Sequence, residues 1–190
     1  QKRGIKFIQG HDPGHISKSV NWVIRSAAVP QDNPEIVRAL KMGIPVVSRG
    51  MVLPELIRSF TSVAVGGTHG KTTTATFIAQ LLKHAGRQPS WCIGGEAVEL
   101  GGVAGFRGKS GFCKTGKFRE RDTIVVEADE SDGTLALYAP DIAVVTNIEF
   151  DHMEHFENVK AFEECFRSFA GAARRKTIYC ADDKRAGTIC

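Results

Sequence analysis

A glycine-rich turn followed by a lysine and two threonines has the clearest chemical potential in the sequence. The turn reads Gly67-Thr68-His69-Gly70, and Lys71-Thr72-Thr73 follows it directly. Glycines let the backbone curl so that its N–H groups point inward, and the positive end of a following helix faces the same space. A lysine here can reach the β- and γ-phosphates of a nucleotide, and the Thr72 hydroxyl can bind Mg²⁺. The segment therefore predicts a phosphate-binding loop.

The loop departs from the strict form of this motif. That form, Gly-x-x-x-x-Gly-Lys-Ser/Thr, requires a glycine where this chain has Val65. The match is therefore to a shorter variant that begins at Gly67. The alternative is an ordinary glycine-rich turn between a strand and a helix, which the Lys-Thr-Thr run disfavours.

Two acidic segments follow predicted strands. Glu127-Ala128-Asp129-Glu130-Ser131-Asp132 follows a strand at residues 123–127, and Asn147-Ile148-Glu149-Phe150-Asp151-His152 follows one at residues 142–147. Ligands of open parallel sheets bind outside the carboxyl ends of the strands, and Mg²⁺ prefers oxygen ligands. Glu127 is the expected metal ligand because it still belongs to its strand. Asp129, Glu130 and Asp132 are expected only to hydrogen-bond nearby loops, and a solvated charged loop is the alternative for the whole segment.

The elements that position these residues alternate along the chain. Apolar runs alternate with amphipathic stretches, and this alternation predicts an α/β fold with a parallel sheet. A helix is expected between the cap residue Asn33 and Gly43, and another at residues 52–60 with Pro54 in its first turn. The helix after the phosphate loop is expected to end at Gly86 and to bury Ile78, Leu81, Leu82 and Ala85. Further strands are expected at residues 6–8, 20–24, 44–47, 63–65 and 177–180, a further helix at 159–173, and a long loop or irregular hairpin at 94–118.

Composition excludes several classes of protein. No apolar run approaches the roughly 18–20 residues of a membrane span, and no signal peptide is indicated. The five cysteines include no CxxC pair, which disfavours a zinc site or a disulfide framework and favours reduced thiols in the cytoplasm. A formal net charge of +4 is too small to indicate nucleic acid as a partner. The chain is therefore expected to be a cytoplasmic protein that binds neither nucleic acid nor membrane.

Three motifs in this order resemble the Mur ligase family. They are the run from Gly67 to Thr74, the segment from Glu127 to Asp132, and Thr146-Asn147-Ile148-Glu149 with Asp151-His152-Met153. Asn33-Pro34-Glu35 and Gly43-Ile44-Pro45-Val46 extend the resemblance over nearly the whole chain. It implies the end of a Rossmann-like UDP-sugar-binding domain at residues 1–60 and an incomplete P-loop-type central ATP-binding domain at residues 61–190. The third domain of such ligases is expected to be missing, so the fragment alone is expected to be inactive.

The resemblance also implies an activity and a set of site residues. The family members that match best join L-alanine to UDP-N-acetylmuramate in peptidoglycan synthesis, with ATP, Mg²⁺ and an acyl-phosphate intermediate. Lys71 is implied to stabilise the transferring phosphoryl group, and the amides of residues 70–73 to cradle it. Thr72 and Glu127 are implied to hold one Mg²⁺, and His152 a second. Asn147 and Glu149 are implied to orient the substrate carboxylate or the amine. His69 is implied to contact the sugar or to have a capping role. Gly67 and Thr68 are implied to bind the nucleotide.

Three alternatives remain open. A related recycling ligase attaches a whole peptide to the same sugar, although Ser131-Asp132-Gly133-Thr134 favours the alanine enzyme. A P-loop NTPase or kinase of another family could use the same turn, although it has no evident need for His152. The third alternative is a nucleotide-binding remnant without catalytic activity.

Overall fold

The computed structural model describes residues 6–26, 29–106, 122–130, 133–150 and 156–190 of the 190-residue chain. The chain divides into two compact units, Gln1–Val52 and Leu53–Cys190. In the described part of the chain, no helix is both long and apolar enough to cross a membrane.

The first unit contains a pair of parallel strands and one amphipathic helix. Strands β1 (Val23–Arg25) and β2 (Val46–Ser48) pair with Val23 opposite Val46. Helix α1 (Pro34–Lys41) connects them and begins where the Asn33 side chain accepts a hydrogen bond from the Glu35 amide, as the sequence predicts. A short 3-10 helix, η1 (Pro13–His15), precedes β1. The predicted strand at residues 6–8 is wrong, and the one at 20–24 forms only as β1, because a short apolar run becomes a strand only where a partner is available.

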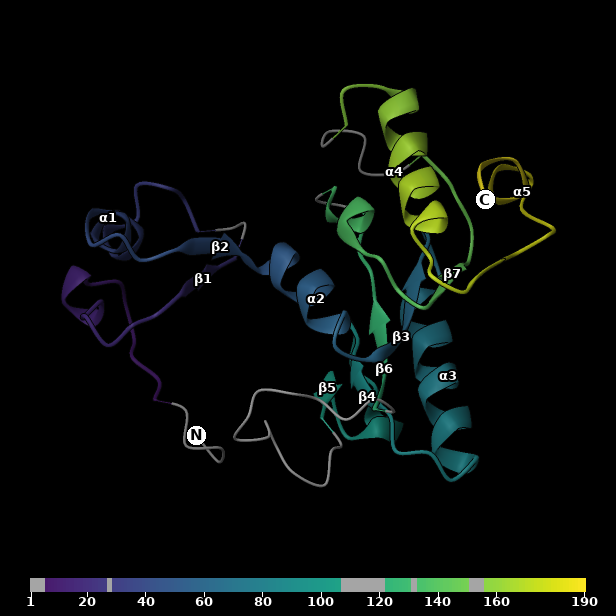
Figure 1. Cartoon of the computed structure of the whole chain (residues 1–190), viewed down its shortest axis with the longest axis horizontal. Coiled ribbons are helices and arrows are strands. Elements are labelled where there is room, and N and C mark those ends of the chain that lie inside the picture. The colour runs from purple at the N-terminus through teal and green to yellow at the C-terminus, as the bar shows by residue number, and fades with distance from the viewer. Residues whose placement is uncertain (1–5, 27–28, 107–121, 131–132, 151–155) are drawn as a thin grey trace. The chain divides into compact units, whose positions relative to one another are not determined.

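The second unit is built on a six-stranded sheet in the order β5-β4-β6-β3-β7-β8 (Figure 1). All neighbouring pairs are parallel except the antiparallel β4 and β5. This arrangement confirms the predicted α/β class with a parallel sheet. The strands are β3 (Thr61–Gly66), β4 (Ser90–Cys92), β5 (Ala104–Gly105), β6 (Thr123–Glu127), β7 (Ile142–Val145) and β8 (Lys176–Tyr179).

The two faces of this sheet bury separate hydrophobic clusters. Val63 and Val65 of β3 pack with Ala75 and Ala79 of helix α3 (Lys71–His84) on one face. Ala64 points to the opposite face, because successive side chains of a strand alternate. There it joins a cluster with helices α4 (Val159–Gly171) and α5 (Lys184–Ile189) that includes Phe162, Phe166, Phe169 and Ile189. Two packed faces hold β3 at the centre of the unit.

Several predicted elements need correction. Helix α2 runs from Arg49 to Ile57, so Pro54 lies inside the helix and not in its first turn. Of the four side chains predicted to be buried on the next helix, Leu81 (69% exposed) and Ala85 are exposed, and Ile78 and Leu82 are half-buried. The helix buries Ala75 and Ala79 instead, because α3 lies close to the sheet and only small side chains fit on that face.

Short elements were missed. Strand β4 has three residues and α5 has six, which are too few to give a periodic signal. The 3-10 helices η2 (Val98–Leu100) and η3 (Thr134–Leu137) were also missed. Within the stretch 94–118, predicted as a long loop or irregular hairpin, β5 forms and pairs with β4, which precedes that stretch, while residues 107–118 lie outside the described part.

Candidate phosphate-binding site

The predicted site residues gather at the carboxyl ends of the three central strands. β3 ends at Gly66, which is paired with Val145 of β7, and Val65 is paired with Glu127 at the end of β6. The three strand ends therefore lie at one level of the sheet, and the loops that follow them meet there. This is the edge at which ligands of open parallel sheets bind.

The phosphate loop has a backbone shape that requires glycine at Gly67 and favours it at Gly70. Gly67 has φ +134°, and a Cβ atom there would overlap the hydroxyl of Thr146. Gly70 has φ +79° and is the N-cap of α3 without any side-chain hydrogen bond to the helix. The first N–H groups of a helix have no acceptors inside the helix. The uncapped start of a 14-residue helix therefore presents backbone donors of the type that binds phosphate.

The segment after β7 fixes the loop from the other side. Thr68 and Glu149 are joined twice: the Thr68 hydroxyl donates to the Glu149 carbonyl at 3.1 Å and accepts from the Glu149 amide at 2.9 Å. The Asn147 side chain accepts from the His69 amide at 2.8 Å and donates to its carbonyl at 3.0 Å. The Thr146 hydroxyl donates to the same carbonyl at 2.6 Å. These five hydrogen bonds hold the loop to the segment after β7.

Lys71 is held inside the loop by a buried carboxylate. Its ammonium donates to both oxygens of Glu130, at 2.8 and 3.0 Å, and lies within hydrogen-bond distance of the carbonyls of Gly67 (2.6 Å) and Thr68 (3.1 Å). The Glu130 side chain is 1% exposed and that of Lys71 12%. Burial raises the pKa of the Glu130 carboxyl, and the hydrogen bond from Lys71 acts in the opposite direction.

Thr72 and Glu127 form a pair of oxygen donors beside the lysine. The Thr72 hydroxyl donates to Oε2 of Glu127 at 2.9 Å, and the Gly94 amide donates to the same oxygen at 2.7 Å. A Cβ at Gly94 would lie 3.0 Å from the Glu127 carboxylate, and one at Gly95 2.8 Å from the Thr72 side chain. A hydroxyl and a carboxylate at this spacing match the hard oxygen ligands of Mg²⁺, so the donor set fits that ion.

The remaining predicted residues occupy the rim of the loop or lie outside the described chain. The side chains of His69 and Glu149 are 62% and 60% exposed, with Nε2 and Oε2 3.8 Å apart. Thr73 is exposed on α3. His152 lies outside the described residues, so its predicted role remains a prediction. Within those residues, no group of three or more His, Cys, Asp or Glu side chains forms a metal site.

Sequence reasoning missed four residues of this site. Glu130 was expected to bond only to a nearby loop, whereas it is the partner of Lys71. Gly94 and Gly95 were not singled out, and Thr146 was quoted as part of a family motif without a role of its own. A Gly-Gly pair after an apolar run is a signal for close backbone approach, but β4 was itself not recognised. The motif that contains Thr146 did not reveal that its hydroxyl holds the His69 carbonyl.

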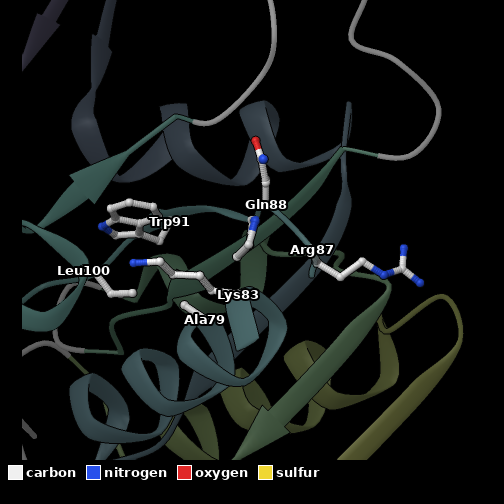
Figure 2. Close-up of a pocket in the computed structure, with 7 residues that line it drawn as sticks. Ala79, Lys83, Arg87, Gln88, Trp91 and Leu100 are labelled. Carbon is white, nitrogen blue, oxygen red and sulfur yellow. The ribbon is translucent and has the colours of Figure 1, made fainter. Parts of the chain in front are cut away.

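A small pocket elsewhere in the unit contains none of these residues. It lies between α3 and the segment from residue 87 to 100, and Ala79, Lys83, Arg87, Gln88, Trp91 and Leu100 surround it (Figure 2). Its volume of about 20 Å³ is far below the roughly 300 Å³ at which small-molecule sites begin. The pocket is therefore too small for a nucleotide.

A parallel sheet whose central strand turns through glycines into an uncapped helix is the arrangement of phosphate-loop α/β proteins. Sequence comparison resolves this class to a family. Residues 65–189 match the Mur ligase middle domain, and residues 1–61 match the domain described as Mur ligase family, catalytic domain. The chain belongs to the Mur ligase family.

The chain is similar to curated UDP-N-acetylmuramate–L-alanine ligases. It is 41% identical to that of Mycolicibacterium vanbaalenii over 98% of this chain, and 41% identical to that of Gloeobacter violaceus over 94%. It spans only 38% and 36% of the length of these two relatives. Among solved structures, the UDP-N-acetylmuramate–alanine ligase of Thermotoga maritima superposes with a TM-score of 0.79 at 26% identity. That match covers 99% of this chain and 41% of the other.

Proposed function

We propose that the chain is the nucleotide-binding part of an ATP-dependent ligase that joins L-alanine to UDP-N-acetylmuramate in peptidoglycan synthesis. The observation that carries this proposal is the identity of about 40% to enzymes named for that reaction, over nearly the whole chain. The site geometry supports it, because the residues that such a reaction needs converge at one sheet edge.

The reaction asks mainly for positioning and charge neutralisation. ATP, when bound, supplies the phosphoryl group that activates the lactyl carboxylate of the sugar as an acyl phosphate, which the amine of alanine then attacks. In this proposal the Lys71 ammonium balances negative charge on the transferring group. Gly67 and the amides from Gly70 to Thr73 cradle the phosphates, supported by the uncapped start of α3.

Thr72 and Glu127 are proposed to hold Mg²⁺ between them. Both are oxygen donors, and the Gly94 amide keeps the Glu127 carboxylate turned toward the Thr72 hydroxyl. The ion would neutralise phosphate charge, which is its usual contribution to phosphoryl transfer. A second Mg²⁺ at His152 stays a prediction from the family resemblance.

Asn147, Glu149, Thr68 and His69 are proposed to act around the phosphate loop. The Asn147 amide bonds the His69 backbone through both its oxygen and its nitrogen, so it shapes the loop, and its second N–H can also meet substrate. The side chains of His69 and Glu149 extend into solvent beside the loop and are free to meet the sugar substrate or the amine. Residues 1–60 are proposed to belong to the UDP-sugar domain and residues 61–190 to the ATP domain of a cytoplasmic enzyme.

Phosphate release by the complete gene product tests this proposal. We expect release from ATP that requires Mg²⁺, UDP-N-acetylmuramate and L-alanine together. Release that ignores the sugar nucleotide would contradict the ligase function. Release with a tripeptide but not with alanine would move the assignment to the peptide-adding ligase, so the assay includes both acceptors.

A further inference from the structure

The Lys71 ammonium is fully engaged by the protein. An ammonium group has three N–H donors, and four acceptor oxygens surround it: one carbonyl each from Gly67 and Thr68, and both carboxylate oxygens of Glu130. A phosphate oxygen can therefore bind the ammonium only by replacing one of these partners. The partner that phosphate displaces determines where the ammonium lies once phosphate occupies the loop.

The four partners are not equally replaceable. The carbonyls of Gly67 and Thr68 are neutral, and each can lose the ammonium without leaving a buried charge. Glu130 is 1% exposed and carries a negative charge in the pair. A buried carboxylate that loses its counter-ion is strongly destabilised. The carbonyls are thus the partners that a phosphate displaces, and the carboxylate stays.

We propose that Glu130 is a positioning residue that remains paired with Lys71 when phosphate binds. The pair fixes the ammonium at one place in the loop, and the carboxylate offsets part of the positive charge that the loop presents to the anion. This inference rests on the proposed function, because it takes the ligand of the loop to be the phosphates of ATP. Glu130 acts through Lys71 and does not itself touch the reacting atoms.

Two nearby carboxylates thereby take different roles. Glu127, the last residue of β6, faces the hydroxyl of Thr72 and the amide of Gly94. Glu130, three positions further along the chain, faces the ammonium of Lys71. The first carboxylate is oriented by neutral donors and is open to a cation, whereas the second already has one.

Titration of the complete gene product with Mg-ATP tests the charge offset. In Glu130→Gln the negative charge is removed while the amide oxygen still accepts from Lys71. We expect Glu130→Gln to bind Mg-ATP roughly tenfold more tightly than the wild type, a change of about 1.4 kcal/mol. The control Glu99→Gln removes one charge from an exposed residue of η2 and should bind as the wild type does. If Glu130 had only a structural role, folded Glu130→Gln would bind Mg-ATP as tightly as the wild type or more weakly.

Nitrogen NMR of the lysine ammonium groups tests the persistence of the pair. The buried Lys71 ammonium should give a slowly exchanging signal that is retained after Mg-ATP is added and is absent from Lys71→Arg. In Glu130→Asp the charge is kept but the carboxylate is drawn back by one methylene. The slowly exchanging Lys71 signal should weaken in Glu130→Asp, and this variant should not show the tighter binding of Mg-ATP expected for Glu130→Gln.

The outcomes separate this inference from the proposed function. Wild-type binding of Mg-ATP with equal or weaker binding by Glu130→Gln overturns the inference alone. Loss of the slow Lys71 signal on nucleotide addition also overturns it, as does an unchanged signal in Glu130→Asp. No binding by the wild type overturns the proposed function and the inference together. If circular dichroism shows that Glu130→Gln does not fold, the Lys71 ammonium signals of Glu130→Asp and of the wild type still test the inference.

Discussion

The hydroxyl of Thr72 donates to Oε2 of Glu127 across 2.9 Å and so joins the first turn of α3 to the last residue of β6. The two residues are 55 positions apart in the sequence. The contact brings together a neutral and a charged oxygen beside the phosphate loop. It is the part of the structure that most directly fits a magnesium ion.

Replacing either residue of this pair should weaken metal-dependent nucleotide binding. We expect Thr72→Val and Glu127→Gln each to lower the affinity for Mg-ATP by at least roughly tenfold, because the first removes an oxygen ligand and the second removes the negative charge of one. Titration calorimetry with and without Mg²⁺ measures the effect. The control Thr188→Val removes an exposed hydroxyl of α5 that bonds only within its own helix, and should change nothing. Equal metal dependence in Thr72→Val and the wild type would remove Thr72 from the proposed site.

Removing Lys71 should abolish turnover, retain the fold and make stability depend more strongly on pH. In Lys71→Ala the buried Glu130 carboxyl loses the hydrogen bond that opposes the rise in its pKa. A raised pKa in the folded state means that the folded protein binds the proton more tightly than the unfolded chain does. Stability should therefore fall as pH rises from about 4.5, the ordinary value, through the raised pKa.

Denaturant unfolding over a pH series measures this effect. The double variant Lys71→Ala with Glu130→Gln should lose the added pH dependence, because no titrating group remains in the pair. Lys83→Ala replaces another lysine of α3 and serves as the control. Identical pH profiles for the single and double variants would contradict the prediction.

An alanine at Gly67 should destabilise the second unit. Its Cβ would collide with the Thr146 hydroxyl, and a φ of +134° is strained for any residue with a side chain. We expect Gly67→Ala to cost at least about 1 kcal/mol of unfolding free energy, measured in urea. Gly171→Ala is the matched control, because a Cβ at this last residue of α4 meets nothing within 4 Å. A Gly67→Ala protein as stable as Gly171→Ala would argue against the loop conformation.

The first unit should lose stability in acid through Glu35. The hydrogen bonds from His11 at 2.9 Å and His15 at 2.6 Å lower the pKa of Glu35 below its ordinary value of 4.5. A lowered pKa in the folded state contributes stability above the unfolded value, which is lost as pH falls through the folded one. Thermal melts of Glu35→Gln should lack this loss below pH 4.5. The control Glu55→Gln, which replaces an exposed residue of α2 that pairs with Arg58 just beyond the helix, should keep it.

The sequence predicted the long elements and the phosphate loop because local signals define them. A cap residue and a stop glycine mark α1, and the Gly-Lys-Thr run marks the start of α3. Glu127 could be chosen as a metal ligand because the strand that carries it is apolar up to its last residue.

The pairing of Lys71 with Glu130 could not be predicted, because it depends on which strands are neighbours in the sheet. The sequence does not say that β6 lies beside β3, nor that the turn after β6 exposes Asp129 and buries Glu130. The prediction that Leu81 is buried was wrong for a related reason. A helical apolar period allows several faces, and the small residues Ala75 and Ala79 fit closest to the sheet.

The contacts between Thr68 and Glu149 also constrain when the site can form during synthesis. They join residues 81 positions apart, so the phosphate loop leaves the ribosome well before the strand that fixes its shape. Contacts of such long range form slowly in folding. A nascent chain that ends before β7 would carry the whole glycine motif and still lack the ordered loop. Under the proposed function, nucleotide affinity would report whether the centre of the sheet has closed.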